Sequence, residues 1–465
     1  MQKVLAICWL TWKAALRFKL FLVIAALLIL AVVGLPLVIR DDGTARGFTQ
    51  IIITYTLSAI TVLLGLSTLW LSCGTLARDI EECQMQVVAT KPIARWQIWL
   101  GKWLGIVTLN AALLAISGAC VYGLLQWRAT KLPPAEQVKL RSEVLVARGS
   151  AKPADVSAEI DADVEQRLQE ALKQNPHMAD MPAAEKNEAI KQIREQVKAE
   201  YQVVPPAYAK GWKIDLGFAK NFLKGKPLQL RVKFNAAQKT ASGTYAGIWQ
   251  IGVPGTGKYW QSEPMSLAAD TFHEFQIPPN LFDENGVMTI AFLNENNTAL
   301  LFPLDDGMEV LYPKGSFEMN LVRGLGIIFC WLALIAALGL MAASFLTFPV
   351  ATFFCLAMLA VVASSSTLAE AIDAGTVMAG NSETGEFGSS AADAVLIPMF
   401  KGMVAMVSVV KDFSPIDALS TGRSIPWTEL GLAFGKIIFL AGGFLAVLGI
   451  IFFSRRELAT AQGTQ

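Results

Sequence analysis

Apolar residues are grouped along the chain into six runs that each match the length of a membrane-spanning helix. A bilayer core requires about 20 consecutive apolar residues in a helix. Three runs precede a long polar stretch, and three follow it. The predicted spans are 20–39, 48–76, 103–126, 324–345, 347–368 and 430–453. The pattern therefore predicts an α-helical integral membrane protein with six transmembrane helices.

A seventh apolar segment, 396–410, is shorter and contains Pro398 and Lys401. Apolar runs of this length are typical of re-entrant or interfacial segments. A seventh crossing would also move Arg455 and Arg456 to the outer side of the membrane. We therefore predict a re-entrant segment within an external loop, 369–428.

The polar stretch between the third and fourth runs has two parts that differ in the spacing of their apolar residues. A spacing of about four residues predicts amphipathic helices, arranged as a hairpin, in 127–204. The two apolar stripes are Ile160, Val164, Leu168 and Leu172, and Ile190, Ile193, Val197 and Tyr201. A spacing of two residues predicts short strands in 205–318, at 228–234, 245–251, 272–277, 288–293 and 299–302. The prediction is an inserted α+β domain, with a helical part and a β-sandwich.

The segment 271–294 resembles the late strands of carbohydrate-binding jelly rolls. The likeness favours a sandwich and allows a glycan as external partner. A docking module for an external protein, or a spacer, is the alternative interpretation.

Basic residues near the predicted span ends indicate the orientation, because Lys and Arg are enriched on the cytoplasmic side. They gather before the first span, between the second and third, and after the last: Lys3, Lys13, Arg17, Lys19, Arg78, Lys91, Arg95, Lys102, Arg455 and Arg456. We predict a multi-pass protein of the inner (plasma) membrane with both termini cytoplasmic. Residues 127–318 would be extracytoplasmic, and periplasmic if the cell is Gram-negative.

Composition agrees with a membrane protein that also has a soluble part. Of the 465 residues 54% are hydrophobic and only 17% are charged, against about 25% charged in soluble domains. The net charge of +1 gives no indication of a nucleic-acid partner. No cysteine lies between Arg128 and Glu318, so the predicted external domain folds without disulfides.

Candidate chemistry is sparse. The segment 252–258, GVPGTGK, fits the first seven positions of a phosphate-binding loop, but Tyr259 stands where the motif needs Ser or Thr. We predict a hairpin turn there. The two histidines, His177 and His273, are far apart, and no catalytic, metal-binding or cofactor-binding motif is present. The sequence therefore predicts no enzyme activity and no directly bound cofactor.

The segment 77–102 reads ARDIEECQMQVVATKPIARWQIWLGK. It resembles the cytoplasmic signature of ABC-2-type ABC transporter permeases, in which an acidic start, a short helix, a basic turn and a Gly-Lys entry to the next span recur. The matching residues are Arg78, Asp79, Glu81, Glu82, Lys91, Pro92, Arg95, Gly101 and Lys102. The segment FSPIDALSTGRSIPWTEL before the last span and the tail FFSRREL also resemble the family; 127–318 does not.

The resemblance implies a permease that exports its substrate, with ATP bound by a separate cytoplasmic ATPase dimer. The loop 77–102 would couple the two subunits through Arg78, Asp79, Glu81, Glu82, Lys91, Pro92 and Arg95. A second copy or a paralogue of the permease would complete the pathway. Residues 1–19 would form an amphipathic helix in the bilayer interface, with Trp9, Trp12, Lys13 and Arg17 facing lipid headgroups and anionic lipid.

The implied layout has an interface helix at 1–19, three spans in 20–126 and external parts at 127–204 and 205–318. Two spans follow in 319–368, then an external loop at 369–428, and the last span and tail at 429–465.

Two other functions stay open. A membrane-anchored binding or scaffold protein explains the external domain, but not six spans and a structured loop. A membrane enzyme lacks a recognisable set of residues. For the loop itself, the charges could also serve topology alone.

Overall fold

The computed structural model describes residues 2–17, 19–38, 44–82, 93–140, 144–174, 183–240, 242–365, 372, 396–402, 404 and 413–456. The chain forms two compact units. The first, called the bundle unit, comprises Met1–Ala147 and Gly315–Gln465, and the second, called the inserted unit, comprises Arg148–Lys314.

Within the described residues, four helices are long and apolar enough to cross a bilayer: Gly47–Glu81, Arg95–Ala129, Phe317–Ala343 and Trp427–Arg455. The first and fifth predicted spans correspond to shorter apolar helices, Val23–Val38 and Phe348–Ala363. The second of these, with 16 residues, rises about 24 Å, which is less than the roughly 30 Å of a bilayer core. The chain is thus a helical membrane protein, and six crossings stay a prediction.

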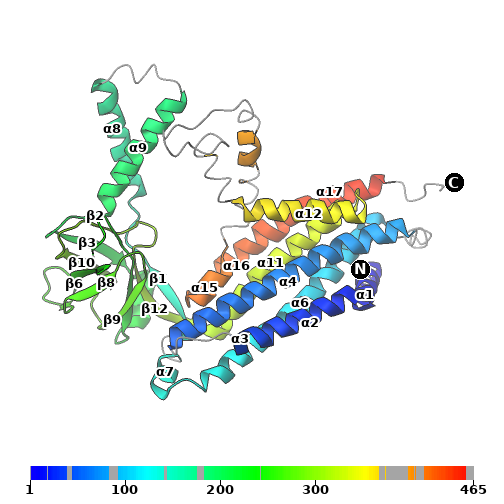
Figure 1. The fold of residues 1–465 in the computed structure, drawn as a ribbon, viewed down its shortest axis with the longest axis horizontal. Helices are drawn as coiled ribbons and strands as arrows, with labels where there is room; N and C mark the ends of the chain where they lie inside the picture. Colours follow the sequence, from blue (N-terminus) through cyan, green and yellow to red (C-terminus); the bar gives the residue numbers. More distant parts are fainter. Residues whose placement is uncertain are drawn as a thin grey trace. The chain divides into compact units, whose positions relative to one another are not determined.

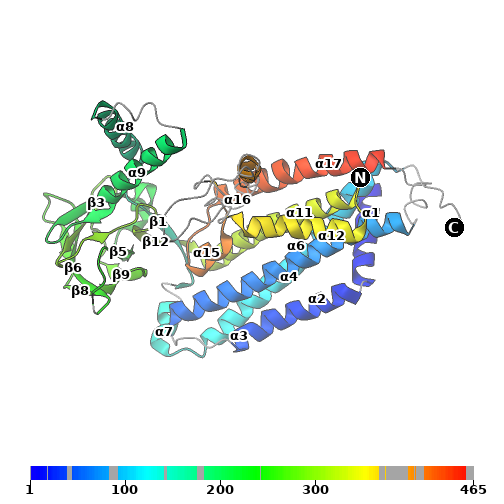
Figure 2. The same cartoon turned by 45° about the horizontal axis from the view of Figure 1, so that its top comes forward.

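The bundle unit is built from long helices that pack lengthwise (Figures 1 and 2). Its elements are α1 (Gln2–Arg17), α2 (Lys19–Ile29), η1 (Leu30–Gly34), α3 (Leu35–Val38), α4 (Ala45–Glu81), α6 (Arg95–Ala129), α7 (Pro134–Lys139), α11 (Phe317–Ala343), α12 (Phe348–Ala363), α15 (Pro415–Ser420), α16 (Trp427–Ala433), η5 (Phe434–Gly442) and α17 (Gly443–Arg455). Residues 396–402, in the predicted re-entrant segment, are helical, and most of 403–412 lies outside the described residues.

Helix α11 is the central helix of the bundle, because it packs against α4, α6, α12 and α17. Small residues let its neighbours approach closely. At Gly339 an added Cβ atom would collide with Ser72 Oγ on α4 and lie 2.8 Å from Ser72 Cβ. Glycine is therefore required at this crossing of α4 and α11.

We expect Gly339→Ala to destabilise the bundle by about 1–3 kcal/mol, the usual cost of overpacking a close-packed contact. Thermal unfolding of the purified protein in detergent measures the loss. The double variant Gly339→Ala/Ser72→Gly removes the colliding side chain and is expected to recover most of the stability. Equal stability of Gly339→Ala and the parent chain would contradict the close approach.

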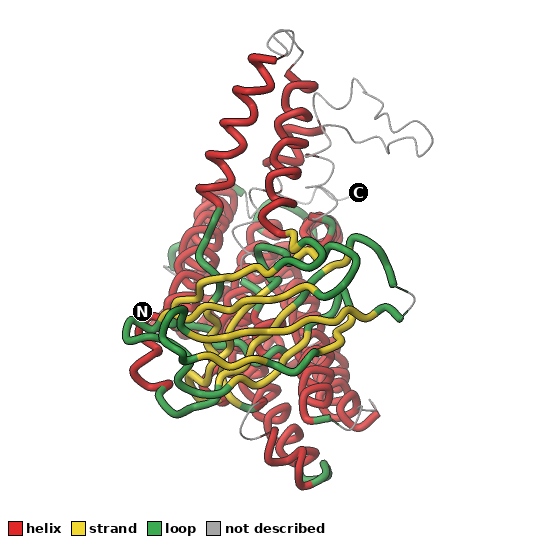
Figure 3. Tube along the Cα trace, turned by 90° about the vertical axis from the view of Figure 1, so that its left-hand side faces the viewer, coloured by secondary structure: helices red, strands yellow, loops and turns green. Residues whose placement is uncertain are grey.

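The inserted unit contains two packed sheets, a small third sheet and a pair of helices (Figure 3). Its elements are β1 (Val146–Ala151), α8 (Ser157–Gln174), α9 (Ala183–Gln202), β2 (Val203–Val204), β3 (Ala209–Asp215), η4 (Gly217–Ala219), α10 (Lys220–Leu223), β4 (Leu228–Val232), β5 (Asn235–Ala236), β6 (Thr244–Gly252), β7 (Tyr259–Gln261), β8 (Met265–Ala268), β9 (His273–Ile277), β10 (Val287–Asn294), β11 (Leu300–Leu301) and β12 (Met308–Ser316).

The strand order is β1-β12-β4-β9 in one sheet and β3-β10-β6-β7 in the other, with β8 also paired to β6. Leu230 of the first sheet and Trp249 and Ile290 of the second are fully buried in one shared core. Along β4, Leu228, Leu230 and Val232 enter this core, whereas Gln229 is half-buried and Arg231 is buried in ion pairs with Glu274 and Glu309. The predicted β-sandwich is confirmed.

The phosphate-loop-like segment 252–258 is a hairpin turn. Gly252 pairs with Tyr259 at the junction of β6 and β7, and Val253 N donates to Lys258 O at 3.0 Å. No helix follows it, since residues 259–261 form β7. The geometry agrees with the turn predicted from Tyr259 and excludes a phosphate-binding loop here.

The helix pair of the inserted unit follows the two apolar stripes. Ile160 and Val164 of α8 pack with Val197 of α9 in a small core of their own. Arg167 of α8 pairs with Glu200 of α9 at 2.5 Å. The other faces of both helices are polar, so the two helices bury only this narrow row of apolar side chains against each other.

Candidate functional site

The residues of the predicted coupling loop lie at two helix ends in the bundle unit. Arg78, Asp79 and Glu81 belong to the last turn of α4, and Glu82 caps that helix. Arg95 is the first residue of α6. Lys91 and Pro92 lie outside the described residues. The described residues of this set, with the partners given below, are called the helix-end cluster.

An ion pair joins α4 to α6 in this cluster. Lys102 Nζ lies 2.5 Å from Asp79 Oδ2 and donates a second hydrogen bond to Thr75 O at 2.7 Å. Lys102 is only 7% exposed. A buried ammonium needs such partners, because removing it from water is costly. The pair therefore holds the end of α4 against the first turns of α6.

Glu81 joins α4 to the start of α12. Its carboxylate accepts a hydrogen bond from Phe348 N at 2.9 Å, at the first residue of that helix. A negative charge is favourable at a helix N-terminus, where backbone N–H groups lack partners. The Arg78 guanidinium also stacks over the Phe348 ring, 4.4 Å from its centroid. Two neighbouring side chains of α4 thus hold the same residue of α12.

Arg95 joins the start of α6 to the end of α17. Its Nη1 lies 2.8 Å from the carbonyl oxygens of Phe453, Ser454 and Arg456. A cation is favourable at a helix C-terminus, where carbonyl groups lack partners. Arg456 in turn donates to Ala343 O at 3.3 Å, at the end of α11. The cluster therefore links α4, α6, α11, α12 and α17 at one end of the bundle.

Helix α1 packs against α6 next to this cluster. At Gly101 an added Cβ atom would lie 2.7 Å from Ile7 Cβ, and at Gly105 it would lie 2.7 Å from Thr11 Cβ. This is the small-xxx-small spacing that lets membrane helices approach closely. Trp12 Nε1 donates to Thr108 Oγ1 of α6 at 3.0 Å.

The opposite side of α1 carries the predicted interface residues. Trp9, Lys13 and Arg17 are exposed, and the Lys13 ammonium lies 5.6 Å from the Trp9 ring centroid. Leu5 and Leu16 are exposed as well. Trp12 does not share this exposure, because it turns toward α6. The structure thus brings the α1 residues close to the cluster, while most of their apolar surface stays uncovered by protein.

Sequence reasoning missed three members of the helix-end cluster. Phe348 lies 267 residues from its partner Glu81, and Arg456 lies 361 residues from Arg95. Thr75 contributes only a backbone carbonyl. No local pattern marks such partners. The one available signal was the position of Arg456 at the end of an apolar run, where helix ends attract cations.

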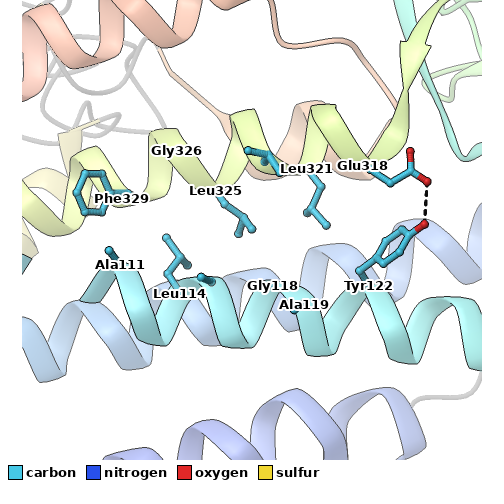
Figure 4. Close-up of a pocket in the computed structure, with 12 residues that line it drawn as sticks. Ala111, Leu114, Gly118, Ala119, Tyr122, Glu318, Leu321, Leu325, Gly326 and Phe329 are labelled. Carbon is cyan, nitrogen blue, oxygen red and sulfur yellow. Dashed lines mark hydrogen bonds between the residues drawn. The ribbon is translucent and has the colours of Figure 1, made fainter. Parts of the chain in front are cut away.

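The bundle unit also contains an apolar groove of about 510 Å³ between α6 and α11 (Figure 4). Its lining residues are Ala111, Leu114, Ala115, Gly118, Ala119, Tyr122, Glu318, Leu321, Val322, Leu325, Gly326 and Phe329. Small side chains on α6 leave this space open. At one end Tyr122 Oη donates to Glu318 Oε1 at 2.7 Å. The groove can accept hydrocarbon, and no pattern in the sequence predicted it.

Comparisons with protein families, with curated proteins and with solved structures find no match for this chain. Among the described residues, no group of three or more His, Cys, Asp or Glu side chains is placed to hold a metal ion.

We expect Tyr122→Phe to lower the stability of the bundle by about 0.5–1.5 kcal/mol, the net value of an ordinary hydrogen bond. The phenol bridges α6 to α11 through Glu318 and also accepts from Gln126 Nε2 at 3.1 Å. Thermal unfolding measures the change. Gln126→Ala is the matched control, since it leaves the bond to Glu318 in place and should cost less. A loss of stability in Gln126→Ala but not in Tyr122→Phe would contradict a stabilising bond between Tyr122 and Glu318.

Proposed function

We propose that this chain is the permease subunit of an ATP-driven ABC transporter of the ABC-2 type, working as an exporter with a separate cytoplasmic ATPase dimer. The observation that carries the proposal is the helix-end cluster. Both helix ends that flank residues 83–92 are bonded to other helices of the bundle, α4 to α12 through Glu81 and α6 to α17 through Arg95.

The cluster supplies a physical route for coupling. A push by the ATPase on the loop would reach the ends of α4 and α6. Because Glu81 and Arg95 bond these ends to α12 and α17, the push would move four helices together. The Asp79–Lys102 pair would keep α4 and α6 from separating under load. Coupling would then depend on charge-assisted bonds between helix ends, which are about twice as strong as neutral ones.

The remaining parts fit the same proposal. The cluster would face the cytoplasm and the inserted unit the outside, in agreement with the basic residues near the span ends. Helix α1 would lie in the cytoplasmic interface with Trp9 in the headgroup region. The chain has no complete phosphate-binding loop, so ATP would be bound by the partner, and a second permease would complete the pathway.

Affinity purification of the tagged full-length chain from native membranes, with mass spectrometry of the proteins retained, tests the proposal. We expect an ATPase with a phosphate-binding loop in near-stoichiometric amount. Retention of external proteins alone, at every detergent strength tried, would contradict it.

That second outcome would favour a membrane-anchored binding or scaffold protein. The observation in its favour is that the inserted unit has a hydrophobic core of its own and is not merely a loop. In that case the external β-sandwich would bind a glycan or an envelope protein, and the bundle would serve as anchor.

A further inference from the structure

The segment between β3 and β4 exposes two aromatic side chains at one end of the sandwich. Residues 217–226 read GFAKNFLKGK, with two phenylalanines, three lysines and no acid. Phe218 is 92% exposed, the largest value among the large hydrophobic side chains of the described residues, and Phe222 is 47% exposed. Paired exposed aromatics on a soluble unit usually mark a surface that something covers.

The backbone under these side chains is held in place. Leu216 and Leu223 are buried in the core of the sandwich, on either side of Phe218. Gly217 has a φ of +52°, which is a conformation that glycine adopts without strain. Gly225 N donates to Asn280 Oδ1 at 2.9 Å. The phenylalanines are therefore presented by an anchored turn.

Lysines surround the two rings. Lys224 and Lys226 are exposed, and neither forms an ion pair with another described residue. Lys220 is half-buried and donates to Glu284 O at 2.8 Å. Asp215 precedes the segment, and its carboxylate accepts from Gly217 N at 2.7 Å. Exposed aromatic rings beside free ammonium groups are the combination that binds an anionic lipid surface.

The topology of the inserted unit places this turn at a particular end of the sandwich. Gln229, at the start of β4, pairs with Leu311 of β12. From Leu311 the strand β12 continues to Ser316, and the candidate span α11 begins at Phe317. The turn 217–226 thus lies at the end of the sandwich from which the chain enters a membrane helix.

We propose that Phe218 and Phe222 insert into the surface of the bilayer that holds the bundle, and that Lys224 and Lys226 bind its anionic phospholipid headgroups. The contact would fix the inserted unit on the membrane. It does not depend on the proposed ATPase partner. A protein partner on the same surface is the competing possibility, and the experiment below separates the two.

The test uses the full-length chain in nanodiscs that contain phosphatidylcholine with or without phosphatidylglycerol. A photo-reactive benzoylphenylalanine replaces Phe218 in one variant and Tyr208 in another. Tyr208 is the matched control because it is 66% exposed and precedes Ala209, at the opposite end of β3 from Asp215. After irradiation, mass spectrometry distinguishes lipid adducts from protein adducts.

We expect lipid adducts at position 218, with a yield about fivefold above that at position 208, the factor expected for one membrane-bound lysine or more. The double variant Lys224→Gln/Lys226→Gln, and nanodiscs without phosphatidylglycerol, should each lower the yield by about fivefold or more. Both labelled positions are exposed, so the fold should tolerate the label, and unchanged thermal unfolding verifies this.

Three results would overturn the proposal. Protein adducts in place of lipid adducts at 218 would assign the turn to a protein partner or a second copy. Equal yields of lipid adducts at positions 218 and 208, or no lipid adduct at 218, would show that the turn does not contact the bilayer. Lipid adducts that respond to neither the lysines nor phosphatidylglycerol would exclude recognition of anionic lipid.

Discussion

The double variant Glu81→Lys/Glu82→Lys is expected to remain in the membrane and to lose coupling to the proposed ATPase partner. Glu81 accepts the Phe348 N–H at the start of α12. A lysine there removes the acceptor and places a cation at a helix N-terminus, beside Arg78. The loss of a charge-assisted hydrogen bond, about 1.5–3 kcal/mol, corresponds to roughly a 10- to 100-fold loss of coupled activity.

ATPase stimulation of the reconstituted complex and transport into vesicles measure this loss, and this prediction rests on the proposed function. Glu81→Gln is the matched control, since its amide oxygen can still accept from Phe348 N without the charge. It should retain most of the coupling. Normal transport in the double variant, with the protein inserted and folded, would show that Glu81 and Glu82 serve topology or packing alone.

The cluster also limits how a coupling element could work here. The described residues that flank 83–92 are tied to neighbouring helices by bonds of 2.5–2.9 Å, between Asp79 and Lys102 and between Glu81 and Phe348 N. Arg95 adds its bonds to the end of α17. An element held in this way moves only with its neighbours. Coupling would therefore be a shared displacement of helix ends.

Much of the fold could be predicted from periodicity. The apolar runs matched helices of the bundle, and the period of two found β4, β6, β9, β10 and β11. Strand β3 was missed because Trp212 and Ile214 are its only large apolar residues, which is too short an alternation to mark a strand. Strand β1 was missed because it consists of small and polar residues, VARGSA. Both take their strand conformation from pairing with a neighbour, a tertiary effect that single-sequence propensity does not contain.

The site was predictable only in part. A local sequence pattern brought Arg78, Asp79, Glu81 and Arg95 to attention, and the structure places them at adjoining helix ends. Their partners could not be predicted, since Arg95 and Phe453 are 358 residues apart. Such contacts depend on how helices stack, which hydropathy does not encode. The turn at Phe218 was overlooked for a related reason: whether a phenylalanine is buried depends on the sheets around it.

The ion pair between Lys102 and Asp79 is expected to give the largest stability effect of any single substitution in the cluster. Lys102→Met removes the ammonium from a site where it is almost fully buried and leaves Asp79 without that partner. Removing one member of a fully buried pair costs about 3–5 kcal/mol. Because the Asp79 side chain is 34% exposed and can be hydrated, we expect a smaller loss here, of about 2–3 kcal/mol. Unfolding of the purified protein in detergent, induced by heat or by denaturant, measures the loss of stability.

Two further variants separate the pair from ordinary packing. Lys102→Met/Asp79→Leu replaces both charges by apolar groups and should recover most of the loss, because apolar replacement of a whole buried pair is often neutral. Lys131→Met is the matched control: Lys131 is exposed, 4.0 Å from the Trp127 ring centroid, and its loss should cost about 1 kcal/mol or less. Equal losses in the single and double variants would mean that the hydrogen bond from Lys102 Nζ to Thr75 O, and not the pairing with Asp79, stabilises α4 against α6. A double variant that recovers its stability but no longer couples ATP hydrolysis to transport would give the pair a different role. Its charges would then be dispensable for the fold and required for the movement of the helix ends.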